Sequence, residues 1–129
     1  MNAQLLNPSQ AQPAAGGRGY SLELERIRRG KHSGFYAILQ GRNVLYVGES
    51  HSGRLFDTIT RHFRSWRLDP SKDPQGRRRG GTTYDRRKVR VVYVILESDV
   101  AQVMQYAEIE RLRPRDNSID GIAVDVVPF

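Results

Sequence analysis

The hydrophobic and polar positions of the chain predict short strands alternating with helices. Two apolar runs, GFYAIL at 34–39 and NVLYVG at 43–48, flank a turn around Gly41. Runs of this kind joined by a tight turn predict an antiparallel hairpin. KVRVVYVILE at 88–97 is dense in β-branched residues and predicts a further strand. IAVDVVPF at 122–129 is expected to add an edge strand at the C-terminal end.

Apolar residues spaced three and four positions apart predict the helices. SLELERIRRG at 21–30 indicates a short helix with Ser21 as its N-cap. A second helix is expected from residue 53 to about 66, and a third over 100–113 with Asp99 as its cap.

The order of these elements predicts the fold class α/β (α+β). We expect a small, mainly antiparallel, three-stranded sheet flanked by helices. A chain of 129 residues is long enough for one domain. Residues 1–20 are rich in Gln, Pro, Ala and Gly and show no period, so they are expected to form a disordered tail before a single domain over 21–129.

Positive charge is concentrated in one part of the chain. Residues 61–90 contain eleven Lys and Arg against three Asp, whereas the whole chain has a formal net charge of +7. A basic stretch of this density is typical of a nucleic-acid-binding surface, and a long basic loop is expected at about 67–88. The residues expected to bind DNA phosphates are Arg61, Arg64, Arg67, Lys72, Arg77, Arg78, Arg79, Arg86, Arg87 and Lys88.

Composition excludes several other classes of protein. The chain has no cysteine, which excludes disulfides, thiolate metal sites and a cysteine nucleophile. It has no apolar run of membrane-spanning length and no signal peptide, so we expect a cytoplasmic protein without a membrane partner. It also lacks a glycine-rich phosphate loop and a serine nucleophile elbow.

Two tyrosine motifs carry a resemblance to a known family. GFY at 34–36, followed ten residues later by YVG at 46–48, resembles the paired motif of the GIY-YIG nucleases. Further residues follow in the family's order, and they are Ser50, Arg54, His62, Glu108 and the PRDN stretch at 114–117. The resemblance covers about residues 33–117. It implies a three-stranded antiparallel sheet with flanking helices and a metal-dependent endonuclease that cleaves DNA, nucleoid-associated in a bacterium or phage.

The same resemblance implies a role for each site residue. Tyr36 would be the general base, and Tyr46 would orient water or phosphate. Arg54 would grip the scissile phosphate, as its planar fork suits phosphate oxygens. His62 would hydrogen-bond a tyrosine or carry its proton, and Asn117 would brace the site.

The resemblance also implies one divalent cation, Mg²⁺ or Mn²⁺, held by Glu108. Mg²⁺ prefers oxygen ligands and often takes only one or two carboxylates. On a helical wheel Glu108 shares an apolar face, and a carboxylate there needs a partner, which a metal would supply. Glu110 and Glu97 are competitors, the first at the helix surface and the second at a strand end.

Several alternatives remain open at this stage. Arg61 competes with Arg54 for the scissile phosphate. Glu49, next to the second motif, would either add a metal contact or repel phosphate. The chain could also be a non-catalytic nucleic-acid-binding module that keeps the fold, or it could act on RNA, with Trp66 and Tyr84 stacking on unpaired bases.

Overall fold

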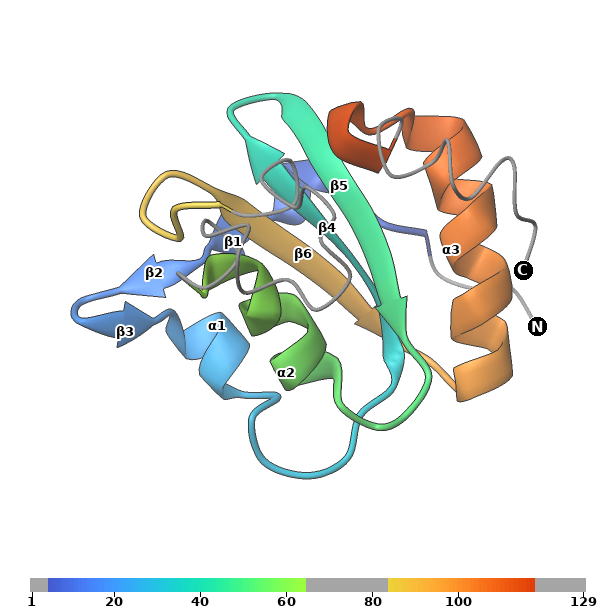
Figure 1. Ribbon diagram of the computed structural model, residues 1–129, viewed down its shortest axis with the longest axis horizontal. Coiled ribbons are helices and arrows are strands. Elements are labelled where there is room, and N and C mark those ends of the chain that lie inside the picture. Colours follow the sequence, from blue (N-terminus) through green and yellow to red (C-terminus); the bar gives the residue numbers. More distant parts are fainter. Residues whose placement is uncertain (1–4, 65–83, 118–129) are drawn as a thin grey trace, which may run out of the picture.

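The computed structural model describes residues 5–64 and 84–117 and places an antiparallel sheet between helices on its two faces (Figure 1). In chain order the elements are η1 Pro8–Gln10, β1 Gln12–Pro13, β2 Ala15–Gly16, β3 Gly19–Tyr20, α1 Leu22–Glu25, β4 Gly34–Gln40, β5 Asn43–Ser50, α2 Leu55–Thr60, η2 Arg61–Phe63, β6 Arg90–Ile95 and α3 Ser98–Leu112. The predicted strand at 122–129, the helical residue Trp66 and most of the predicted basic loop lie outside the described residues.

The sheet has the strand order β1-β6-β4-β5, and every pair in it is antiparallel. The expected fold class, a mixed α/β domain with an antiparallel sheet and flanking helices, is confirmed. The short strand β1 joins the three predicted strands as a fourth by pairing Gln12 with Val91. A separate two-stranded sheet consists of β2 and β3.

The helices differ from their predictions at the ends. Helix α1 is only four residues long, although Ser21 caps it as expected, with its hydroxyl accepting from the Leu24 amide. The N-cap of α3 is Glu97, and the predicted cap Asp99 lies within the first turn of the helix. The Asp99 carboxylate accepts from the Val100 amide. No helix within residues 5–64 and 84–117 is long and apolar enough to cross a membrane.

Side chains of β4 alternate between two apolar clusters, as the period of a strand requires. Phe35, Ala37 and Leu39 point toward α3, where they pack with Val47, Val92 and Val94. Tyr36 and Ile38 point to the other face, where they pack with residues of α1 and α2. The central strand is therefore buried on both faces.

A β-bulge in β5 places two neighbouring side chains on the face of the sheet that carries Tyr36. The pairing of β5 with β4 shifts register between Ile38 and Leu39, so Leu45 is an extra residue without a partner. Leu45 and Tyr46 consequently pack in the same cluster, although neighbouring residues of a regular strand face opposite ways.

Residues 5–20 form short elements and contribute to the core, which corrects the expectation of a disordered tail over 1–20. Leu6 is 2% exposed and packs in the cluster beneath α3. The Ala14 amide donates to the Val89 carbonyl oxygen, and the Ser21 amide donates to the Ala14 carbonyl oxygen. Composition misled the prediction because a few buried side chains and backbone hydrogen bonds along β6 hold a segment that has no periodic pattern.

Candidate active site

The candidate site is built around a buried hydrogen bond between Tyr36 and His62. The Tyr36 hydroxyl oxygen lies 2.7 Å from His62 Nε2, and the two residues are 1% and 5% exposed. The Tyr46 ring lies against His62, with ring centroids 4.7 Å apart. The structure thus brings together the two motif tyrosines and the helical histidine, which are separated by up to 26 positions in the sequence.

Glycine at position 48 makes room for the Tyr36 phenol. Gly48 pairs with Tyr36 across the β4–β5 ladder, and a Cβ at this position would lie 2.5 Å from the Tyr36 hydroxyl oxygen. Any side chain there would force the phenol or the strand to move. The second motif glycine is therefore required by the position of Tyr36.

Arg54 begins α2 at the end of a hydrogen-bonded turn. Its amide donates to the Ser50 hydroxyl, while the Gly53 amide donates to the hydroxyl of Ser33. Gly53 has a φ of 77°, a conformation that glycine adopts without strain. The Arg54 guanidinium is exposed and makes no hydrogen bond or ion pair with any of the described residues, so it can bind an anion.

Asn117 holds the outer edge of β5 beside the site. Its side-chain oxygen accepts from the Val47 amide at 2.6 Å, and its side-chain nitrogen donates to the Val47 carbonyl oxygen at 3.0 Å. These bonds satisfy backbone groups that an edge strand otherwise leaves unpaired. Val47 lies between Tyr46 and Gly48. Asn117 therefore holds the backbone of the strand segment that carries both motif residues.

Two residues that sequence reasoning did not select also belong to this cluster. The Tyr84 ring lies 5.9 Å from the His62 ring between centroids, and its hydroxyl donates to Asp116 at 2.6 Å. Burial and the Asp116 carboxylate raise the pKa of Tyr84, so its phenol stays neutral. The sequence contains one signal for Asp116 as a site residue, which is its position directly before Asn117. Tyr84 was considered only as a residue that stacks on bases.

Glu108 lies on the other side of the sheet from Tyr36. It is 1% exposed, and α3 packs on the face of β4 opposite to Tyr36. Its carboxylate accepts from the Leu6 amide at 3.0 Å and from Arg111 at 2.6 and 2.8 Å. Arg111 also donates to the Leu6 carbonyl oxygen at 2.7 Å, so the Glu108–Arg111 pair fastens the N-terminal segment to α3.

These contacts do not fit Glu108 as a ligand for a cation beside the tyrosines. A buried carboxylate needs a partner, and Arg111 with the Leu6 amide supplies it in place of a metal. Within residues 5–64 and 84–117 no three His, Cys, Asp or Glu side chains gather where they could hold a metal ion. Binding of Mg²⁺ or Mn²⁺ stays a prediction, but the contacts of Glu108 do not fit its expected role as the ligand.

Glu49 occupies the end of β5 next to Gly48. Its carboxylate lies 3.0 Å from His51 Nδ1, and the Gln102 side-chain nitrogen lies 3.2 Å from the same atom. With Phe35 as its cross-strand partner, Glu49 belongs to the face that α3 covers. The acid is therefore engaged with His51 at the sheet edge rather than directed at Tyr36.

The basic residues expected to bind DNA separate into three groups. Arg61, Arg64 and Lys88 are exposed, and exposed Arg87 is paired with Asp85. Arg86 has a structural role, since its guanidinium donates to the carbonyl oxygens of Gly19 and Arg18. The remaining five, Arg67, Lys72, Arg77, Arg78 and Arg79, lie outside the described residues.

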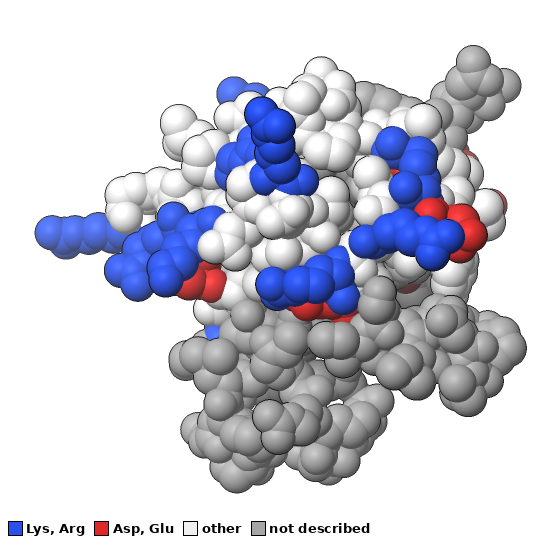
Figure 2. All heavy atoms as spheres, turned by 90° about the horizontal axis from the view of Figure 1, so that it is seen from above, with Lys and Arg blue, Asp and Glu red and all other residues white. Residues whose placement is uncertain are grey.

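Figure 2 shows the face that carries the β4–β5 turn, where Lys and Arg form several separate groups. Asp or Glu side chains lie beside some of these groups. On this face, the described residues therefore do not form one continuous basic patch.

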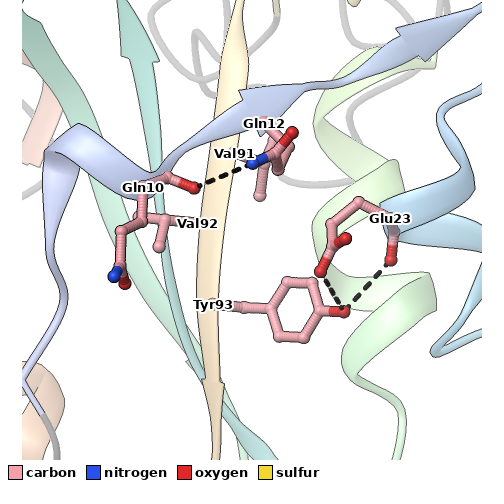
Figure 3. A pocket seen from close by; sticks show the side chains of 6 residues that line it. All are labelled: Gln10, Gln12, Glu23, Val91, Val92 and Tyr93. Carbon is pink, nitrogen blue, oxygen red and sulfur yellow. Dashed lines mark hydrogen bonds between the residues drawn. The ribbon is translucent and has the colours of Figure 1, made fainter.

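A small hollow lies at the β1 edge of the sheet (Figure 3). It has a volume of about 130 Å³ and is lined by Gln10, Gln12, Glu23, Val91, Val92 and Tyr93. The Tyr93 hydroxyl donates to the Glu23 carbonyl oxygen at 3.0 Å and contacts the Glu23 carboxylate at 3.3 Å. Glu23 also pairs with Arg26. The Gln12 side-chain nitrogen lies 3.5 Å from the Gln10 carbonyl oxygen, and none of the lining residues belongs to the cluster around Tyr36 and His62.

Glu108→Gln tests whether this carboxylate is a structural residue. Loss of the ion pair with Arg111 should lower the free energy of unfolding by about 2 kcal/mol, less than for a fully buried pair because Arg111 is partly exposed. Glu110→Gln, two positions along α3 at an exposed site, is the matched control and should change it by less than about 0.5 kcal/mol. Urea denaturation measures both, and equal stability of the two variants would contradict the structural role.

The raised pKa of Tyr93 predicts that the folded protein loses stability at alkaline pH. Burial and neighbouring Glu23 raise the pKa of Tyr93 to about 12. The folded state therefore favours the neutral phenol, and this stability is fully present below the unfolded pKa of about 10 and is lost as pH rises toward 12. Tyr93→Phe should make the fall in unfolding free energy between pH 10 and pH 12 smaller. An unchanged pH dependence would show that Tyr93 does not contribute.

Comparison with known proteins adds no relative on which a function could rest. The chain matches no protein-family model, no curated protein and no solved structure. The functional argument therefore depends on the motif residues and on the geometry that joins Tyr36, Tyr46, His62, Tyr84 and Asp116.

Proposed function

We propose that the chain is an endonuclease of the GIY-YIG type that hydrolyses phosphodiester bonds in DNA. The observation that carries this proposal is the hydrogen bond of 2.7 Å between the Tyr36 hydroxyl and His62 Nε2, with Tyr46 beside it. An imidazole nitrogen within hydrogen-bond distance can take the proton of a phenol directly. This geometry supports Tyr36 as the group that accepts a proton from water.

The reaction is a hydrolysis in which Tyr36 and His62 act together. Tyr36 gives its proton to His62 Nε2, and the phenolate then takes a proton from the attacking water. The water oxygen bonds to phosphorus as the bond between phosphorus and the leaving sugar oxygen breaks. The leaving oxygen takes a proton from solvent, and His62 returns its extra proton to solvent. The products are a phosphomonoester and an alcohol, and no step passes through Glu108.

The order in which substrate meets these groups follows from their burial. Tyr36 is only 1% exposed, whereas Tyr46 is half-buried and Arg54 is exposed. The DNA backbone would meet exposed Arg54 first, and water would then enter past Tyr46 to reach Tyr36 and His62. Catalysis therefore requires the cluster to admit water, and Tyr36 works only after that entry.

DNA as the substrate rests on charge. Exposed Arg61, Arg64 and Lys88 belong to the basic stretch and can contact phosphates on either side of the cleaved bond. Phosphate contacts give affinity and salt dependence rather than recognition of sequence. We expect weak sequence preference or selection of branched and single-stranded structures, and RNA is the competing substrate to include in the assay.

The second candidate is a nucleic-acid-binding module without turnover. It is favoured by one observation, the engagement of Glu108 with Arg111 and Leu6, which leaves the expected metal ligand occupied. Binding to all nucleic acids tested without cleavage in Mg²⁺ or Mn²⁺ would establish this module and overturn the nuclease.

Tyr36→Phe tests the nuclease directly. Removal of the hydroxyl should reduce the cleavage rate about 10²–10⁴-fold, the range for loss of a general base, and should leave DNA affinity nearly unchanged. Tyr106→Phe, at a tyrosine on α3 that is 48% exposed, is the matched control and should cleave normally. The assay uses branched, duplex and single-stranded DNA and RNA with Mg²⁺, Mn²⁺ or chelator. Full activity of Tyr36→Phe would remove Tyr36 from the mechanism.

Arg54→Gln and Arg61→Gln together decide which arginine binds phosphate at the site. Loss of one phosphate contact should reduce the slope of log affinity against log salt by about 0.9 for duplex DNA. We expect this change for Arg54, which begins α2, together with a lower cleavage rate. Arg26→Gln, at an exposed arginine paired with Glu23, is the control. A normal slope and rate for Arg54→Gln, with losses for Arg61→Gln, would transfer the role to Arg61.

A further inference from the structure

The chain that follows α3 turns back onto the edge of the sheet. Arg113 ends α3 with a φ of 50°, a left-handed conformation that changes the direction of the chain. Asp116 and Asn117 come next, and they are only 1% and 5% exposed. Asn117 bonds to Val47 of β5, so Asp116 is held close to the strand that carries Tyr46.

Asp116 is a buried carboxylate with two partners. It accepts from the Tyr84 hydroxyl at 2.6 Å and from the Arg115 guanidinium at 2.7 and 2.9 Å. Arg115 is largely exposed, with 64% of its side chain accessible, so it balances the charge from the solvent side while Tyr84 bonds from the interior. Burying a carboxylate is costly, and the Tyr84 and Arg115 bonds offset part of that cost.

Tyr84 connects Asp116 to His62, because it bonds to Asp116 and makes two contacts with His62. The Tyr84 amide donates to the His62 carbonyl oxygen at 2.8 Å, which fixes the backbone of η2. The Tyr84 ring lies against the His62 ring with centroids 5.9 Å apart. A histidine held at both its backbone and its ring keeps one orientation, which sets the nitrogen that it presents to Tyr36.

We propose that Asp116 is a positioning residue of the candidate site, which acts through Tyr84 to fix His62 in the orientation that bonds Tyr36. Asp116 does not touch the reacting atoms. For what His62 does in catalysis the inference rests on the proposed function, whereas the orientation of His62 can be measured without any activity.

The groups around the His62 ring link it to Asp116 through Tyr84. Tyr36 from β4, Tyr46 from β5 and Tyr84 surround its ring, and all three are phenols. Among residues 5–64 and 84–117, the charged groups close to it in the chain are Arg61 and Arg64, and beyond Tyr84 lie Asp116 with Arg115, and Asp85 with Arg87. Asp116 is the acid that bonds to Tyr84, so its removal should make the His62 cation less favourable.

The test follows the ring nitrogens of His62 by NMR across pH in the wild type, Asp116→Asn and Tyr84→Phe. Asp116→Asn should lower the midpoint of the His62 titration by about half a pH unit to one unit, since a nearby negative charge stabilises the imidazolium. Tyr84→Phe keeps the ring and removes the hydroxyl, and it should shift the His62 resonances at fixed pH. Asp85→Asn, next to Tyr84 but in an exposed ion pair with Arg87, is the matched control and should change neither.

Cleavage kinetics complete the test. Asp116→Asn and Tyr84→Phe should each reduce kcat about tenfold, with KM unchanged and the acidic limb of the pH–rate profile displaced in Asp116→Asn. Folded variants with wild-type His62 resonances and a wild-type pH profile would overturn the inference. If Asp116→Asn fails to fold, Tyr84→Phe decides the outcome. Altered His62 resonances in a protein that cleaves nothing would support the positioning of His62 and refute the proposed nuclease.

Discussion

The hydrogen bond between Tyr36 and His62 is the interaction on which the arrangement of the site depends. It buries a phenol and an imidazole together, and the hydrogen bond between them offsets part of the cost of burying these polar atoms. The bond also joins the central strand β4 to η2, which directly follows α2. Gly48 must lack a side chain because the Tyr36 hydroxyl fills the space beside it. The second motif glycine and the helical histidine are thus consequences of one buried contact.

The two faces of the sheet carry different kinds of side chains. The face of α1 and α2 holds the tyrosine cluster, in which Tyr36 is bonded to His62 and Tyr84 is bonded to Asp116. The face of α3 carries the second apolar cluster, and there Glu108 is paired with Arg111 and holds the N-terminal segment at Leu6. The segment that follows α3 links both faces at the edge of β5, since Asn117 bonds to the strand and Asp116 bonds to Tyr84.

Local patterns predicted the hairpin and the third strand correctly, since alternation and a turn around Gly41 are sufficient to specify them. The bulge at Leu45 was not predictable because register depends on both strands at once. The partner of Glu108 was missed for a similar reason. Its amide partner Leu6 is 102 positions away, and no local pattern encodes that contact. Tyr84 and Asp116 are 32 positions apart, and only the fold brings them together behind His62.

The central claim is that Tyr36 and His62 form one buried proton-transfer pair. The most direct measurement is the NMR signal of His62 Nε2 in the wild type and in Tyr36→Phe, at a pH where both proteins are folded. The account predicts a hydrogen-bonded proton between Tyr36 and Nε2 that exchanges slowly with solvent and is lost, with a shift of the Nε2 resonance, in Tyr36→Phe. The same Nε2 resonance in both proteins, with rapid exchange at this position, would contradict it.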